Sequence, residues 1–116
     1  MPNDFNVTVT PSADGLSGSC SPFKAEPIGP NALLKFKFPA GTTGWSFVAN
    51  SFAIKSTSPN QPGAGMFQVM NSSSAAQMVV QDQNGDGKLY SYLIKIQKGT
   101  AAPVTIDPDI QNDVET

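Results

Sequence analysis

Apolar and polar residues alternate along several short stretches of this chain, and a repeat of two residues is typical of half-buried β-strands. The pattern is most regular over 90–96, where every second residue is aromatic or aliphatic, and it recurs over 5–10. Ten glycines and ten prolines interrupt the chain too often for helices of any length. The pattern therefore predicts an all-β protein.

The middle of the chain contains two alternating patterns that are out of phase with each other. Trp45 and Phe47 occupy odd positions, whereas Phe52 and Ile54 occupy even positions. A shift of one residue turns the side chains of a strand to the opposite face of the sheet. We therefore expect a bulge, a bend or a change of strand at Asn50–Ser51.

The remaining segments complete a chain of short strands and turns. The Ser, Gly and Pro-rich stretch 11–30 is predicted to be a loop with room for one short edge strand near 23–28, and 107–116 a polar tail. Seven or eight short strands in one chain favour an antiparallel sandwich or a small barrel. We predict a single domain over residues 1–116. The predicted core consists of Val7, Val9, Leu34, Phe36, Phe38, Trp45, Phe47, Phe67, Val69, Met78, Val80, Tyr90, Tyr92, Ile94 and Ile106.

Composition excludes several classes of function. The chain has no His, which excludes every His-based triad or metal cluster within it, and its net charge of −2 gives no basic surface for nucleic acid. The single Cys20 excludes an intrachain disulfide and a thiolate zinc site. No segment is apolar enough to span a membrane. The N-terminus has no signal-peptide pattern and predicts a cytoplasmic protein, although abundant Ser, Thr, Asn and Gln without Arg also suit a secreted bacterial protein.

The run 86–94 resembles the corner between strands E and F of immunoglobulin-like sandwiches, where Asp and Gly precede a Tyr. Tyr90 would be the corner tyrosine, and Tyr92 would occupy the position of the antibody cysteine. Trp45 falls near the position of the core tryptophan. The resemblance implies an immunoglobulin-like antiparallel β-sandwich of seven to eight strands. The cysteine pair of antibody domains is absent.

A second resemblance rests on Tyr90-x-Tyr92-x-Ile94 followed by Ile106-Asp107-Pro108-x-Ile110-x-Asn112. This pattern is similar to a family of small bacterial proteins, the DP-EP family, named for its DP and EP dipeptides. Asp107-Pro108 and Glu26-Pro27 would be those dipeptides. The resemblance implies an all-β sandwich of unknown function and brings no active site with it.

The loop Asp82–Gly87 contains Asp82, Asn84 and Asp86, spaced like the first three ligands of an EF-hand calcium loop. The twelfth position of that motif, a bidentate Glu in EF-hands, is Leu93 here, and the flanking segments are strands. The alternative interpretation is a turn, because Asn-Gly and Asp-Gly favour positive φ. The turn is the preferred interpretation, and weak Ca²⁺ binding is the alternative.

Other chemistry-bearing residues have simpler structural interpretations. Asp107 and Asp109 could form an acid–base pair, but Asp before Pro is typical of the end of a strand. Cys20 has no neighbouring His, Lys or second Cys in sequence to activate it, which favours a plain loop or buried thiol. The aromatic residues Trp45, Phe47, Tyr90 and Tyr92 could stack on sugars, but their alternation fits a core better.

Three classes of function follow, in order of preference. The first is a non-enzymatic structural or protein-interaction module, in which a protein partner or a second copy of the chain adds to an edge strand. The second is a small-ligand binder, for carbohydrate at the aromatic residues or for Ca²⁺ at the Asp82–Gly87 loop. The third is an enzyme, which would need a partner chain or a cofactor to supply the missing groups.

Overall fold

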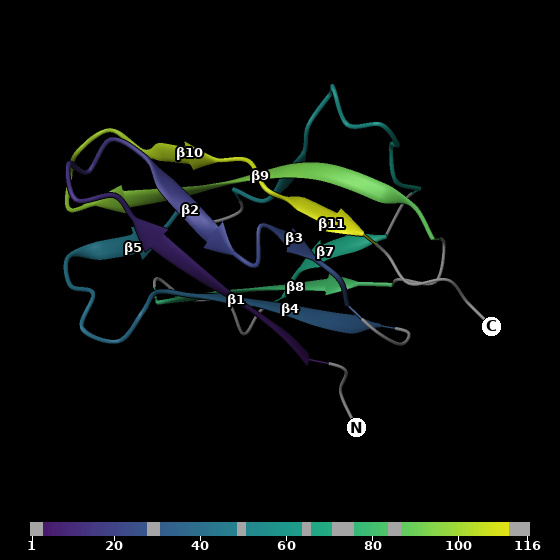
Figure 1. Ribbon diagram of the computed structural model, residues 1–116, viewed down its shortest axis with the longest axis horizontal. Coiled ribbons are helices and arrows are strands. Elements are labelled where there is room, and N and C mark those ends of the chain that lie inside the picture. Colours follow the sequence, from purple (N-terminus) through teal and green to yellow (C-terminus); the bar gives the residue numbers. More distant parts are fainter. Residues whose placement is uncertain are drawn as a thin grey trace.

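The structure is a computed structural model that describes residues 4–27, 31–48, 51–63, 66–70, 76–83 and 87–111. All of the regular secondary structure in these ranges is β-strand, which confirms the predicted all-β class. The described residues contain no helix long and apolar enough to cross a membrane. Two sheets pack against each other, with the core between them (Figure 1).

The first sheet has five strands in the order β2-β1-β4-β8-β7. Apolar residues at alternate positions of its three central strands point into the core, and most residues at the intervening positions are polar and point away from it. The exceptions are Leu33 of β4 and Val79 of β8, which are apolar at intervening positions, and Asp82 of β8, which is buried. β1 runs parallel to β4, whereas the other neighbours in this sheet are antiparallel. The strands are β1 (Asp4–Pro11), β2 (Gly18–Ser21), β4 (Ala32–Lys37), β8 (Gln77–Asp82) and β7 (Phe67–Val69).

The second sheet is organised around β9 (Leu89–Lys98), the longest strand, which arches across the molecule in Figure 1. One edge of β9 pairs with β10 and then β11, and the other edge pairs with β5 and then β6. β3 pairs with β11 in a parallel orientation. These shorter strands are β3 (Lys24–Ala25), β5 (Trp45–Phe47), β6 (Ala53–Ile54), β10 (Val104–Ile106) and β11 (Asp109–Gln111).

The sheets are mixed, which corrects the prediction of purely antiparallel sheets. The two parallel pairs, β1–β4 and β3–β11, both arise because the chain forms the β1–β2 hairpin, crosses to the other sheet as β3 and then returns. The described residues form eleven strand segments, whereas the sequence predicted seven or eight strands. Much of the difference arises because the partner along each edge of β9 is divided into two segments. These segments are β5 and β6 on one edge and β10 and β11 on the other.

The phase change predicted at Asn50–Ser51 coincides with one of these interruptions. Asn50 lies outside the described residues, but Ser51 lies between β5 and β6. The amide of Lys95 on β9 donates a hydrogen bond to the hydroxyl of Ser51 at 3.0 Å. Ser58 accepts a hydrogen bond from the amide of Ser91 in the same way, at 2.9 Å. Serine hydroxyls thus bind β9 amides that a continuous partner strand would otherwise bind.

Two segments that were predicted to be irregular form strands instead. β2 lies within the predicted loop 11–30, and β11 lies within the predicted polar tail. Cys20 on β2 and Ile110 on β11 point into the core, with exposed fractions of 7% and 0%. In both segments a single apolar residue stands among small or polar ones, so no alternation reveals the strand.

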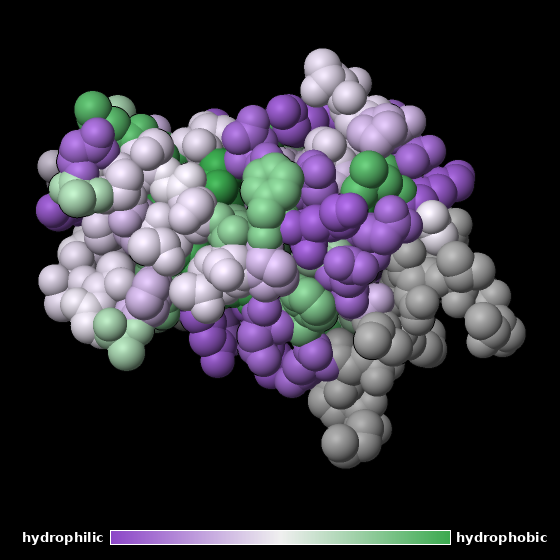
Figure 2. All heavy atoms as spheres, viewed as in Figure 1, coloured by the Kyte–Doolittle hydropathy of each residue, from purple (hydrophilic) through white to green (hydrophobic). Residues whose placement is uncertain are grey.

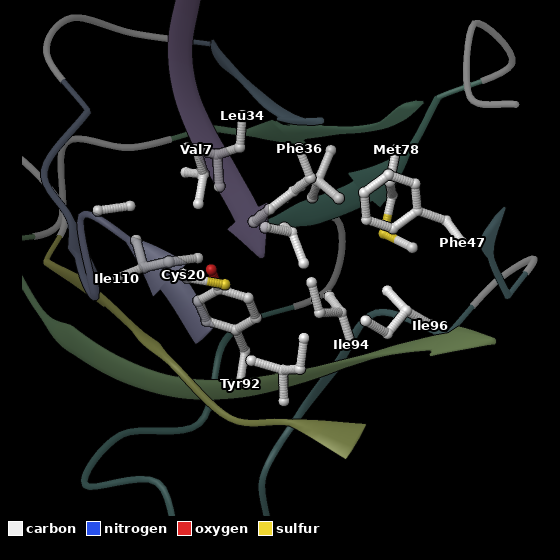
Figure 3. Packing of buried hydrophobic residues seen from close by; sticks show 14 of the residues in the cluster. Val7, Cys20, Leu34, Phe36, Phe47, Met78, Tyr92, Ile94, Ile96 and Ile110 are labelled. Carbon is white, nitrogen blue, oxygen red and sulfur yellow. The ribbon is translucent and has the colours of Figure 1, made fainter. Parts of the chain in front are cut away.

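The core lies between the two sheets and is drawn in Figure 3. All of the predicted core residues are buried or half-buried, and Phe38, Trp45, Phe67 and Val69 are half-buried at the margin of the core. The rings of Phe36 and Tyr92 meet edge to face across the sheets, with centroids 5.8 Å apart. The buried apolar residues that the predicted core omitted are Cys20, Ala25, Ala32, Val79, Ile96, Val104 and Ile110.

Candidate functional site

The predicted calcium ligands are only partly described by the structure. Asp82 is the last residue of β8 and is completely buried, between Ala32 of β4 and Phe67 of β7 in the register of the sheet. Asn84 and Asp86 lie outside the described residues. Gly87 has a φ of 66°, as the turn interpretation requires. Ca²⁺ binding at this loop stays a prediction.

The carboxylates of Asp107 and Asp109 each contact a different neighbouring side chain. The ammonium of Lys55, which follows β6, reaches Asp107 at 3.1 Å on the opposite side of β9. The hydroxyl of Ser91 donates a hydrogen bond to Asp109 at 2.9 Å. Both contacts fasten the segments that flank β9, so each carboxylate has a structural role. The exposed ion pair contributes at most about 1 kcal/mol to stability.

Cys20 is a buried thiol, in agreement with one of the two plain interpretations of it. Burial raises its pKa to about 12 from an ordinary value of 9.0, so the thiol is protonated at neutral pH and is a poor nucleophile. The hydroxyl of Tyr92 lies beside its sulfur (Figure 3). Among the described residues that hydroxyl has no hydrogen-bond partner, and burial raises the pKa of Tyr92 well above 10.0.

The predicted aromatic platform does not form on the surface. Phe47, Tyr90 and Tyr92 are buried, with exposed fractions of 6%, 1% and 0%, so their rings cannot stack on a sugar. Trp45 is half-buried against the core. The alternation of these residues therefore reflects their packing in or against the core.

One end of the sandwich presents mostly small, uncharged residues, with Asp14 and Leu16 as exceptions. The connections 12–17, 39–44 and 99–103 lie together at the left of Figure 1, and the same end is pale and green in Figure 2, with few hydrophilic residues. Leu16 projects from the first of these turns with 80% of its surface exposed. Asp14 holds this turn by accepting hydrogen bonds from the hydroxyl of Ser12 and the amide of Leu16.

The first half of β1 forms a sheet edge with unpaired backbone groups. β2 pairs with β1 only over Thr8–Pro11 (Figure 1). In the described part of the chain no strand pairs with that side of Asp4–Val7. The amide of Ser12 donates a hydrogen bond to the carbonyl of Ser17 in the β1–β2 hairpin. Because hydrogen-bonded pairs recur at every second residue of an antiparallel ladder, the even-numbered residues of β1 direct their N–H and C=O groups toward the β2 side. Asp4 and Asn6 therefore each present one N–H and one C=O outward.

Two features make this edge suitable for a partner. β4 holds the other side of β1 in register over Asp4–Thr8, so the strand is already extended. Phe23 lies two residues after Ser21, where the chain leaves β1, and 59% of its surface is exposed. The edge thus presents unpaired backbone groups, and an exposed aromatic residue follows the end of β2 by two positions.

A second open edge is that of β7 at the opposite side of the same sheet. The amides of Met70 and Gln83 donate hydrogen bonds to carbonyls across the β7–β8 ladder. Since bonded and non-bonded residues alternate along the strand, Phe67 and Val69 direct their backbone N–H and C=O groups away from β8. β7 is only three residues long. In the second sheet, Lys24 and Pro27 lie at and just beyond β3, and such residues discourage strand addition.

The sequence predicted that edge strands would be the interaction surface, but not which edges stay open. That depends on where β2 ends, and β2 itself was not predicted. Comparison of the sequence with protein-family models finds no matching family, and comparison with curated proteins finds no similar sequence.

Proposed function

We propose that this protein is a non-enzymatic interaction module that binds an extended segment of a partner by strand addition at an open sheet edge. The observation that supports it most is the first half of β1, where Asp4 and Asn6 present unpaired backbone groups toward the open side of the strand. Strand addition gives affinity through main-chain hydrogen bonds and specificity through alternate side chains. An exposed edge strand is a ready template for such pairing.

We further propose an immunoglobulin-like arrangement of the sandwich. β4, β8 and β7 would correspond to strands B, E and D, and β5 with β6, β9, and β10 with β11 to strands C, F and G. In this assignment Phe36 and Tyr92 join the two strands that a B–F disulfide links in antibody domains. Tyr90, the corner tyrosine, packs its ring against Phe67 at 5.2 Å. The parallel pairing of β1 with β4 is a departure from that family pattern.

The absence of catalytic activity is part of the proposal. The chain has no His, and its one thiol is buried and protonated at neutral pH. Asp107 and Asp109 are engaged by Lys55 and Ser91. These assignments give Cys20, Asp107 and Asp109 structural roles.

The proposal is tested by nuclear magnetic resonance of the backbone amides during titration with short synthetic peptides of alternating apolar and polar residues. We expect the outward amides of Asn6, or those of Phe67 and Val69, to shift and to exchange more slowly with solvent. The amides of Val7 and Gln68, which already bond within the sheet, provide the matched internal control. Changes confined to the loops at 12–17, 39–44 and 99–103, or no change at all, would contradict edge binding.

The second candidate is a small-ligand binder, supported by the half-exposed position of Trp45 beside the turn that carries Gly15. Quenching of Trp45 fluorescence by oligosaccharides would favour a carbohydrate site at that end. A rise in melting temperature with millimolar Ca²⁺ would favour the Asp82–Gly87 loop, because a ligand that binds only the folded state stabilises it. Neither response is expected of a strand-addition module.

A further inference from the structure

We propose that the segment added at the β1 edge is β1 of a second copy of this chain, paired antiparallel about a two-fold axis that passes beside Phe5. The inference rests on the proposed function and identifies the partner. Its result would be a symmetric dimer in which the five-stranded sheets of the two copies join into one continuous sheet.

The backbone of the open edge is complementary to itself. Asp4 and Asn6 point their N–H and C=O groups outward, and they are two positions apart, which is the spacing of successive hydrogen-bonded pairs in an antiparallel ladder. A two-fold axis at Phe5 places Asp4 opposite Asn6 of the second copy and Asn6 opposite its Asp4. Both pairs then exchange two hydrogen bonds, and every outward group of Asp4 and Asn6 gains a partner. Such an isologous contact closes the assembly at two chains.

The side chains on the outer face of the sheet are compatible with this register. Directly opposed residues of an antiparallel pair interact through their side chains, and like charges there are destabilising. Asp4 would face the amide of Asn6, which can donate to a carboxylate. The ammonium of Lys35 already lies 2.9 Å from the Asp4 carboxylate and compensates its charge. No like charges are therefore brought together.

The inner face of the joined sheet brings apolar groups to the axis. Phe5 is half-buried, packs against the core, and would lie directly opposite Phe5 of the second copy. A strand placed along the edge would continue the line of β2 beyond Ser21 and would bury more of the half-buried Phe5 side chain, which favours association.

The β1 edge fits a second copy better than the other open edge does. β7 has three residues, and its self-pairing would place Gln68 opposite Gln68 with the backbone groups of Phe67 and Val69 as the bonded pairs. The open part of β1, Asp4–Val7, is one residue longer than β7 and is paired with β4 throughout. Both edges are held extended by a neighbouring strand, but only the β1 register opposes a carboxylate to an amide that can donate to it.

Sedimentation velocity over a range of concentrations up to about 1 mM tests the inference, since a contact of this small size gives a weak dimer. We expect the wild-type chain to dimerise within this range. Asn6→Asp places carboxylates opposite each other twice per dimer and should raise the dissociation constant about tenfold or more. The double variant Asp4→Asn with Asn6→Asp restores opposed amide and carboxylate groups, and its dissociation constant should return close to the wild-type value. Gln68→Asp at the β7 edge, the matched control, should leave it unchanged.

The outcomes separate this inference from the proposed function. A wild-type chain that stays monomeric, or an Asn6→Asp variant that dimerises like wild type, overturns the assignment of the β1 edge to a second copy. Loss of dimer in Gln68→Asp in place of Asn6→Asp also overturns it, but leaves strand addition as the function. Failure of Asp4→Asn with Asn6→Asp to restore the dimer would contradict the register. If the peptide titration also shows no change at either edge, the proposed function fails as well.

Discussion

Replacing Tyr92 by Phe should stabilise the protein, although it removes a polar group from the centre of the core. The Tyr92 side chain is completely buried, and within the described residues its hydroxyl has no hydrogen-bond partner. A buried polar group without a partner costs about 1–3 kcal/mol. The ring contacts with Phe36 and Phe52, at centroid distances of 5.8 and 5.1 Å, do not involve the hydroxyl. We therefore expect Tyr92→Phe to raise the free energy of unfolding by about 1 kcal/mol.

Urea denaturation followed by the fluorescence of the single tryptophan, Trp45, measures this change. The melting temperature should rise by about 4 °C. Tyr92→Leu, which removes the ring as well as the hydroxyl, is the control and should lower the free energy of unfolding by about 2 kcal/mol or more. A loss of 1 kcal/mol or more in Tyr92→Phe would refute the reasoning, because it would show that the hydroxyl makes a favourable interaction in the folded protein.

Three further predictions follow from the core and its margins. Phe36→Ala should lower the free energy of unfolding by about 3–5 kcal/mol, measured by urea denaturation, because Phe36 is fully buried; a loss below 1 kcal/mol would argue against its place in the core. The pKa of Cys20 is raised to about 12, so the unfolded chain loses this proton near pH 9 while the folded protein keeps it. Stability should therefore fall as pH rises from about 9 to about 12, and Cys20→Ala should reduce that slope in alkaline urea titrations. Gly18→Val should destabilise the protein by about 1–3 kcal/mol in thermal denaturation, because a Cβ at Gly18 would lie 2.7 Å from Cδ1 of Ile106; an unchanged melting temperature would mean that β2 does not pack tightly on β10.

The sequence predicted which face of each strand is buried better than it predicted which strands pair with each other. Alternation identified β9 and β4, and the phase change near Ser51 marked an interruption that the structure also has. Alternation reports which side of a strand is buried, but it does not specify the strand beside it. The parallel pairs β1–β4 and β3–β11 therefore could not be predicted, since they depend on the path of the chain between distant segments.

Strands with little apolar content were also beyond prediction. β2 has the sequence Gly-Ser-Cys-Ser, and its only buried residue is Cys20. β11 contributes only Ile110 to the core. Each is a strand because a longer neighbour, β1 or β9, offers it a ladder of hydrogen bonds, so tertiary context overrides local propensity.

The candidate site could not be predicted for the same two reasons, because it depends on strand pairing and on a strand with few apolar residues. That a sandwich has open edges follows from its fold class, but the open part of β1 is defined by the end of β2 at Ser21, opposite Thr8. The residue-specific candidate that the sequence offered was the Asp82–Gly87 loop, as an alternative to a turn, because turn residues there also resemble a ligand motif.

Hydrogen exchange of two adjacent amides, measured at low and at high protein concentration, tests the central claim most directly. The amide of Val7 points toward β4 and should be protected at both concentrations, whereas that of Asn6 points to the open edge. We predict that the Asn6 amide exchanges rapidly in dilute solution and becomes protected as the concentration rises. An Asn6 amide that is equally protected in dilute solution, or equally exposed at high concentration, would contradict an open edge that pairs with a second copy.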